Sequence, residues 1–218
     1  MRAFRLIAEP GLVSRILWTL CWLPARLLAT WFPYSSFKLC ATPAGAYVAV
    51  INHLSHLDPP VAGLALRRPV RYLALDELWG NSAILDRILD AFEAIPFPRE
   101  GRYPIGALKQ AIRHLESGGI IGVFPEGRRV HNWGDAPVTR GAAWLAVKAD
   151  VPLVPVAIWG TQHAMPLDTM RLHRAPIRVA VGCPIAPGEF AECQDKVRAL
   201  TRAVTEELDR QIRTLAKG

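Results

Sequence analysis

Short apolar runs rich in β-branched residues alternate with amphipathic stretches over most of this chain of 218 residues. Runs that are apolar on both sides are typical of strands buried on both faces of a sheet. The predicted strands span residues 46–51, 70–75, 119–124, 153–158 and 177–181. Helical periodicity marks residues 59–66, 81–92, 104–116, 141–149 and, at the end, 190–215. The alternation predicts an α/β fold with a central, mostly parallel sheet flanked by helices.

The first 44 residues have a different character. Residues 11–33 are strongly apolar, but Arg15 and Arg26 interrupt them and Pro24 lies in between. A helix that crosses a bilayer needs about 20 mostly uncharged residues, which this stretch does not offer. On a helical wheel Arg15, Thr19 and Arg26 share one stripe opposite the apolar side chains, which indicates a helix lying in a membrane interface. A signal peptide, or a soluble helix packed on the domain, are the alternatives.

Net charge indicates the class of binding partner, and cysteine content indicates the redox compartment. Lys and Arg outnumber Asp and Glu by 26 to 19, and the net charge of +7 favours an anionic partner. Up to residue 44 the single acid is Glu9, so an anionic membrane surface is favoured there, while no basic and aromatic module indicates nucleic acid. The four cysteines lack metal or disulfide spacing, which predicts no disulfide scaffold and a reducing, cytosolic setting. We therefore expect a membrane-associating segment (1–44) and an α/β domain with a C-terminal helix (45–218).

A histidine and an aspartate follow the first predicted strand. His53 and Asp58 are five positions apart, so a turn rather than a helix must bring them together. In that case Asp58 can bind one imidazole nitrogen and leave the other as a general base. Because no G-x-S-x-G motif is present and no cysteine lies near, the nucleophile would come from the substrate. Each residue alone has a simpler explanation: Asp58 before two prolines as a helix N-cap, and His53, His56 or Ser55 as loop residues.

A second cluster follows the third predicted strand and contains Glu126, Gly127, Arg128 and Arg129. Arg99 follows another possible strand upstream. If these strands are parallel, their ends share one edge of the sheet with the His53 loop, and an arginine-lined pocket there would suit a phosphate group. Any one of these arginines could instead be an ordinary surface residue.

Residues 47–160 resemble the glycerolipid acyltransferase family, whose best-known members are lysophosphatidate acyltransferases. Four blocks carry the resemblance, in order. They are the N-H-x-S-x-x-D block at 52–58, an upstream block ending at Arg99, the F-P-E-G-T-R block at 124–129 and an apolar block with prolines at 151–158. Arg128 replaces the usual threonine of the third block, which bears on the acceptor's head group.

The resemblance implies acyl transfer from a fatty acyl thioester to the free hydroxyl of a lysophospholipid, foremost lysophosphatidate. The thioester, on coenzyme A or acyl carrier protein, is a co-substrate, and neither a cofactor nor a metal is expected. His53 would act as the base, Asp58 would orient it, and Arg99, Glu126, Gly127, Arg128 and Arg129 would form the acceptor site. The expected location is the cytoplasmic face of the cell membrane, bound peripherally or monotopically.

Three alternatives to this function are open. The acceptor could be another lyso-lipid, such as an amino-acid lipid or a glycolipid. His53, His56, Asp58 and Glu126 could bind a metal for phosphoester hydrolysis. The chain could also be a non-catalytic protein that binds anionic lipid through its basic N-terminus.

Overall fold

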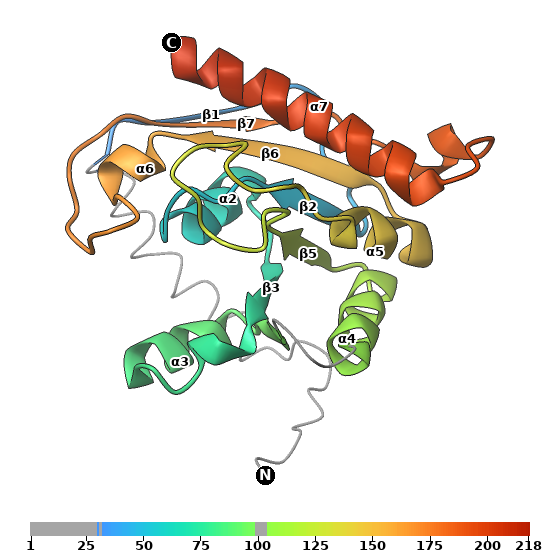
Figure 1. Ribbon diagram of the computed structural model, residues 1–218, viewed down its shortest axis with the longest axis horizontal. Coiled ribbons are helices and arrows are strands. Elements are labelled where there is room, and N and C mark those ends of the chain that lie inside the picture. Colours follow the sequence, from blue (N-terminus) through green and yellow to red (C-terminus); the bar gives the residue numbers. More distant parts are fainter. Residues whose placement is uncertain (1–29, 31, 99–103) are drawn as a thin grey trace.

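The computed structural model describes residues 30, 32–98 and 104–218 (Figure 1). In this part of the chain seven strands form one sheet in the order β1-β7-β6-β2-β5-β3-β4. Neighbouring strands are parallel except β6 and β7. The strands are β1 (Tyr34–Lys38), β2 (Tyr47–Ile51), β3 (Val70–Leu75), β4 (Ile95–Phe97), β5 (Ile120–Val123), β6 (Leu153–Trp159) and β7 (Ile177–Val181). The predicted mostly parallel sheet is confirmed.

Helices cover both faces of the sheet, so the fold has three layers (Figure 1). Side chains of β2 alternate: Tyr47, Ala49 and Ile51 pack toward α2, whereas Val48 and Val50 pack toward α4, α5 and α7. All five are fully buried, as the unbroken apolar run predicts. The helices are α2 (Asp58–Leu66), α3 (Ala83–Ala91), α4 (Ile105–Glu116), α5 (Gly141–Ala149), α6 (Thr161–Ala164) and α7 (Lys196–Lys217), with 3₁₀ turns η1 (Asp76–Leu78) and η2 (Pro187–Phe190).

The sheet begins earlier in the chain than the predicted domain boundary after residue 44. Strand β1 lies within the predicted membrane-associating segment, yet it pairs with β7 over its whole length. Four of its five residues are exposed, because it is an edge strand, and its polar sequence gives no sign of a buried run. The predicted interfacial helix within residues 11–33 lies outside the described residues, apart from its last few positions.

The last helix starts later than its periodicity predicts. Helix α7 begins at Lys196 rather than at Phe190, because the Asp195 side chain accepts a hydrogen bond from the Arg198 amide at 2.9 Å and caps the helix. Residues 187–195 form η2 and a turn instead. From Lys196 on, α7 packs its predicted apolar face against β6 and α5.

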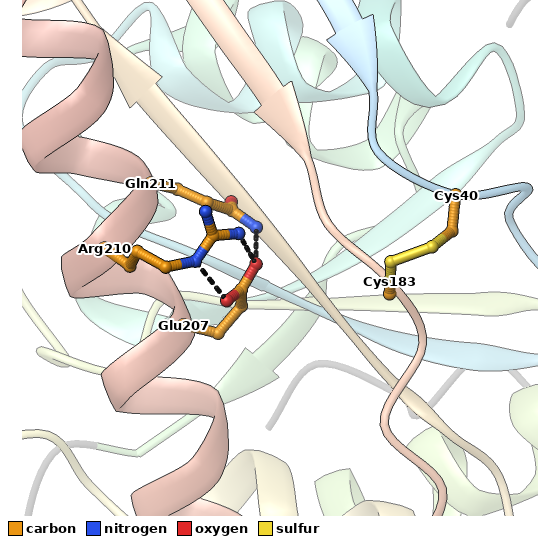
Figure 2. The surroundings of a disulfide bond; sticks show 5 residues. All are labelled: Cys40, Cys183, Glu207, Arg210 and Gln211. Atoms are coloured by element: carbon orange, nitrogen blue, oxygen red, sulfur yellow. Dashed lines mark hydrogen bonds and ion pairs between the residues drawn. A yellow bond between two sulfur atoms is a disulfide. The ribbon is translucent and has the colours of Figure 1, made fainter.

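The expectation of no disulfide is wrong in this structure. Cys40 and Cys183 are joined, with their Cα atoms 4.8 Å apart (Figure 2). The register of the neighbouring strands explains the pairing: Lys38 of β1 lies opposite Val181 of β7, so the cysteines two residues further on also meet. The two cysteines are 143 positions apart in the sequence, so their spacing does not predict the pairing. Nearby on α7, Glu207 accepts hydrogen bonds from Arg210 and Gln211 (Figure 2).

Strand direction determines what gathers at one edge of the sheet. Strands β6, β2 and β5 are adjacent and parallel, so their carboxyl ends lie together. Helices α2 and α6, which follow β2 and β6, lie toward the left of the view in Figure 1. Because β7 runs antiparallel to β6, both β7 and its parallel neighbour β1 begin at this same edge. We call it the carboxyl edge.

Candidate active site

A histidine and a carboxylate are in contact at the carboxyl edge. The Nδ1 atom of His53 lies 3.0 Å from Oδ2 of Asp58. An ionised carboxylate can only accept hydrogen bonds, so Nδ1 carries the proton and Nε2 of the neutral ring keeps its lone pair. The side chain of Asp58 is fully buried, while that of His53 is 17% exposed. The pair predicted from spacing is therefore brought together by the turn between β2 and α2.

Backbone amides and a distant hydroxyl hold the Asp58 carboxylate. Its Oδ2 also accepts from the Leu54 amide at 2.6 Å and the Ser55 amide at 2.7 Å. Its Oδ1 accepts from the Thr161 hydroxyl at 2.6 Å. Four donors on one buried carboxylate leave it a single orientation. The N-cap explanation does not hold, since Leu57 is the N-cap of α2 and the Asp58 side chain turns back to the loop before the helix.

The loop after β5 holds His53 from the other side. The Phe124 ring stacks on the His53 ring with centroids 3.9 Å apart. The His53 amide donates to Oε1 of Glu126 at 3.0 Å, and the His53 carbonyl accepts from the Val130 amide at 3.0 Å. Ring, amide and carbonyl of His53 are thus each in contact with residues 124–130.

Glu126 is more buried than the sequence suggests. Its side chain is 6% exposed, and Oε2 has no hydrogen-bond partner among the described residues. Burial raises the pKa of this carboxyl from its usual 4.5 to about 7, against the lowering effect of the His53 amide. A buried carboxyl bound to the backbone of His53 is poorly suited to contact a phosphate, the role that the resemblance implies for it.

Gly127, Arg128 and Arg129 form the turn after Glu126 and differ in conformation and exposure. Gly127 has a φ of +66°, which favours glycine, and its amide closes the turn by donating to the Phe124 carbonyl at 3.0 Å. Arg128 is exposed, and Arg129 is half-buried. The Nη1 atom of Arg129 is buried without a hydrogen-bond partner in the described part of the chain.

Arg129 interacts electrostatically with Asp58 of the His53–Asp58 pair. Burial lowers the pKa of Arg129, and the negative charge of Asp58 partly offsets this. Burial lowers the pKa of His56, the charges of Arg129 and His53 lower it further, and the charge of Asp58 partly offsets these effects. Arg129 is therefore a positive group that interacts with the charge of Asp58, and its buried Nη1 has no hydrogen-bond partner among the residues that the structure describes.

Other polar residues of this region serve the loop's structure. The Ser55 hydroxyl is buried and donates to the Met165 carbonyl at 2.8 Å, so it is not presented as a nucleophile. Asn52 locks β2 to β6 by bonding both the amide and the carbonyl of Ile158. Arg99 lies outside the described residues, after the edge strand β4.

Thr161, the donor to Oδ1 of Asp58, is a site residue that the sequence motifs did not predict. It is 103 positions from Asp58, on the other side of β2 from Glu126. A signal was present: Thr161 is the polar residue just past the carboxyl end of a predicted strand, where α/β proteins place functional groups. Weighing every strand end in the same way would have found it.

Within residues 30, 32–98 and 104–218, no three His, Cys, Asp or Glu side chains are placed to share a metal ion. Among the helices described, none is long and apolar enough to cross a bilayer.

Comparison with known proteins places this geometry in a family. A family model described as "Acyltransferase" matches residues 38–159, more than half of the chain. The chain belongs to the acyltransferase family. The matched residues of this acyltransferase include β2, β5 and β6 and all the described contacts of His53.

Individual relatives agree with this assignment. This acyltransferase is 31% identical to a 1-acyl-sn-glycerol-3-phosphate acyltransferase of Bacillus subtilis over 170 residues, 78% of this chain and 80% of the relative. It is 32% identical to the human 1-acyl-sn-glycerol-3-phosphate acyltransferase alpha over 165 residues, 72% of this chain and 57% of the human protein. A crystal structure of the 1-acyl-sn-glycerophosphate acyltransferase PlsC of Thermotoga maritima has the same fold, with a TM-score of 0.73 and 22% identity, covering 96% of this chain and 84% of that one.

Proposed function

We propose that this acyltransferase moves a fatty acyl group from a thioester to the free hydroxyl of lysophosphatidate and so forms phosphatidate. The observation that carries the proposal is the contact between His53 Nδ1 and the buried Asp58, which leaves Nε2 to act as a base on the acceptor hydroxyl. The names of the Bacillus subtilis and human relatives support the acceptor. The alternative is an acceptor other than lysophosphatidate, because the exposed Arg128 stands where the family's acceptor block usually has threonine.

The proposed reaction needs only the groups described. Nε2 of His53 removes the proton of the acceptor hydroxyl as its oxygen attacks the thioester carbonyl. The C–O bond of the new ester forms, the C–S bond breaks, and the proton passes from His53 to the departing thiolate. Asp58 holds the imidazole in the required tautomer and stabilises the imidazolium between these two transfers. Atoms and charge balance without a cofactor.

Thiol release tests this proposal. The purified full chain is incubated with long-chain acyl-CoA, with and without lysophosphatidate in detergent, and thiol and lipid products are followed. We expect release that depends on the acceptor, with phosphatidate as the product. Acyl-ACP in place of acyl-CoA distinguishes the donors, and a lyso-amino-acid lipid tests the other acceptor class. No release with any donor or acceptor would overturn the proposal and favour a non-catalytic lipid-binding protein.

We assign Arg129 to the acceptor phosphate, because its buried Nη1 has no hydrogen-bond partner in the described part of the chain and its charge interacts with that of Asp58. We expect Arg129→Ala to raise the KM for lysophosphatidate about tenfold or more, since a hydrogen bond to a charged group contributes about 1.5–3 kcal/mol. The KM for the thioester should change little. Steady-state kinetics with each substrate varied measures this, and Arg113→Ala at an exposed residue of α4 is the control. A fall in kcat alone would contradict the assignment.

We assign Glu126 a positioning role, because its carboxylate contacts the His53 amide and is nearly closed to solvent. Glu126→Ala removes that acceptor and should lower kcat about tenfold or more with the KM for lysophosphatidate unchanged. Glu126→Gln keeps an acceptor oxygen and should retain most of kcat. A rise in KM with kcat preserved would instead place Glu126 in the acceptor site.

The buried carboxyl of Glu126 also predicts a pH dependence of stability. Between pH 4.5 and about 7 the unfolded chain releases this proton while the native chain keeps it, so the free energy of unfolding falls as pH rises. Glu126→Gln has no such proton. Relative to wild type, the variant should therefore gain up to about 3 kcal/mol across this window. Urea unfolding of both proteins at several pH values checks this, and parallel curves would contradict a buried, protonated Glu126.

We place the enzyme at the cytoplasmic face of the cell membrane. The lipid acceptor and product belong to the bilayer, and acyl-CoA and acyl carrier protein thioesters are water-soluble donors. The net charge of +7 supports attraction to an anionic surface. The apolar stretch 11–33 supplies the sequence for that association, as proposed from its pattern.

A further inference from the structure

The connection between α6 and β7 carries exposed apolar and basic side chains in alternation. Residues 170–174 read Met-Arg-Leu-His-Arg, and all five are exposed. Met170 is 71% and Leu172 38% exposed, so neither is part of the core. No acidic residue occurs from 169 to 176. We call residues 169–176 the basic loop.

The base of this loop is firmly attached, although its tip is exposed. The His173 amide donates to the Ala164 carbonyl at 2.8 Å, and the Ser55 hydroxyl donates to Met165 at 2.8 Å. Ala175 is buried in the same cluster as Met165 and Phe32. The basic loop is therefore fastened to the core through Ala175 and to the end of α6 through His173, and the residue after α6, Met165, is bonded to the loop that carries His53.

The basic loop lies at the carboxyl edge. It leaves from α6, directly after β6, and returns into β7, whose first residue Ile177 donates to the Pro33 carbonyl at 2.9 Å. Figure 1 shows the loop and the start of β1 at the same end of the molecule, on the left of the view. The apolar stretch 11–33 thus joins the domain beside the basic loop, and both lie at the edge that carries His53 and Asp58.

We propose that the basic loop docks on an anionic phospholipid surface. Met170 and Leu172 enter the boundary between head groups and acyl chains, and Arg171 and Arg174 contact head-group phosphates. Amphipathic elements with basic and apolar side chains bind interfaces in this way, and each basic residue near an anionic leaflet strengthens binding about fivefold. The proposal rests on the membrane association proposed above and names the residues that make the contact, and its binding test needs no turnover.

Binding to vesicles tests the charge requirement. The full chain is partitioned onto vesicles of phosphatidylcholine alone and of phosphatidylcholine with phosphatidylglycerol. Arg171→Glu/Arg174→Glu should weaken binding to the anionic vesicles about tenfold or more, and binding to neutral vesicles far less. The matched control is Lys196→Glu/Arg198→Glu, the same charge change at exposed residues of α7, and should have little effect. If both double variants lost binding to the anionic vesicles equally, net charge alone would explain the effect, and the proposal would be overturned.

A second pair of variants tests the apolar contacts. Met170→Ser/Leu172→Ser should weaken binding severalfold, since two apolar side chains no longer enter the interface. Phe37→Ser/Leu39→Ser is the control, because these residues of β1 and just beyond it are also exposed, 42% and 43%, but lie away from the carboxyl edge. Unchanged binding of the first pair would overturn the insertion of Met170 and Leu172.

An environment-sensitive thiol label reports contact directly. Met170→Cys/Cys193→Ser is labelled at residue 170, and the comparison protein is labelled at Cys193, which is exposed near the start of α7. Cys21→Ser is made in both proteins. On anionic vesicles the emission of the label at 170 should shift to the blue, and that at Cys193 should not. A shift at Cys193 alone, or a dimer without vesicles that covers residue 170, would overturn the proposal.

Turnover separates this proposal from the proposed function. The loop variants should keep wild-type thiol release with lysophosphatidate dispersed in detergent and lose it with lysophosphatidate embedded in anionic vesicles. If wild type docks but transfers no acyl group, the proposed function fails and the docking surface stands. If the variants bind and turn over on vesicles like wild type, the docking surface fails alone.

Discussion

Replacing His53 with alanine is expected to lower kcat for acyl transfer by about 10³-fold or more. General-base catalysis by a positioned histidine contributes about 10²- to 10⁴-fold, and a lysophosphatidate hydroxyl is a weak nucleophile without it. The fold should survive, because the imidazole is held by Asp58 and Phe124 but supplies no backbone contact. Thiol release under saturating acyl-CoA and lysophosphatidate measures the loss.

The neighbouring histidine provides the control for this variant. His56 is exposed, belongs to the same loop and has a lowered pKa. The imidazole that bonds to Asp58 is that of His53. His56→Ala should keep kcat within a few-fold of wild type. Circular dichroism and unfolding midpoints of both variants separate lost chemistry from lost structure. Wild-type turnover in His53→Ala would refute the proposed base.

The second large effect is expected for Asp58→Asn, with kcat reduced by about 10²- to 10⁴-fold. Asparagine has the shape of aspartate, and its oxygen can replace Oδ2 as the acceptor for the Leu54 and Ser55 amides. Its amide group can then donate to Thr161, whose hydroxyl also accepts. What is lost is the negative charge that stabilises the His53 imidazolium.

Comparison with alanine at the same position distinguishes charge from structure. Asp58→Ala leaves buried loop amides without an acceptor, which costs about 1–3 kcal/mol for each unsatisfied group. It should therefore lose stability as well as activity, whereas Asp58→Asn should lose chiefly activity. Unfolding by urea together with kcat measures both. If Asp58→Asn turned over like wild type, the charge of Asp58 would have no part in the reaction.

The centre of the sheet was largely predictable because its strands are buried on both faces. An unbroken apolar run such as 153–158 has few alternatives to a central strand, and the structure places β6 there. Strand β1 has no such pattern, since an edge strand with exposed side chains gains its order from pairing with β7. Its sequence Tyr-Ser-Ser-Phe-Lys therefore reads as a loop.

The candidate site divides along the same line between local and distant contacts. His53 and Asp58 are five residues apart, so spacing and residue type were enough to predict their contact. The contacts of Glu126 and Thr161 span 73 and 103 positions and depend on β5 and β6 flanking β2. It is the burial of Glu126, and not its residue type, that distinguishes its structural role from that of a surface residue that could contact a phosphate. One sequence without strand order contains neither fact.

The disulfide closes the part of the chain that contains the site into a covalent ring. A covalent ring begins at Cys40 and returns at Cys183, 143 positions later, and it contains His53, Asp58 and Glu126. The apolar N-terminal stretch and α7 are two tails outside this ring. In the chain-entropy description a ring of this size removes about 5 kcal/mol of freedom from the unfolded state. A single protease cut inside the ring therefore leaves both pieces of the site on one molecule, and they part only when the disulfide is reduced.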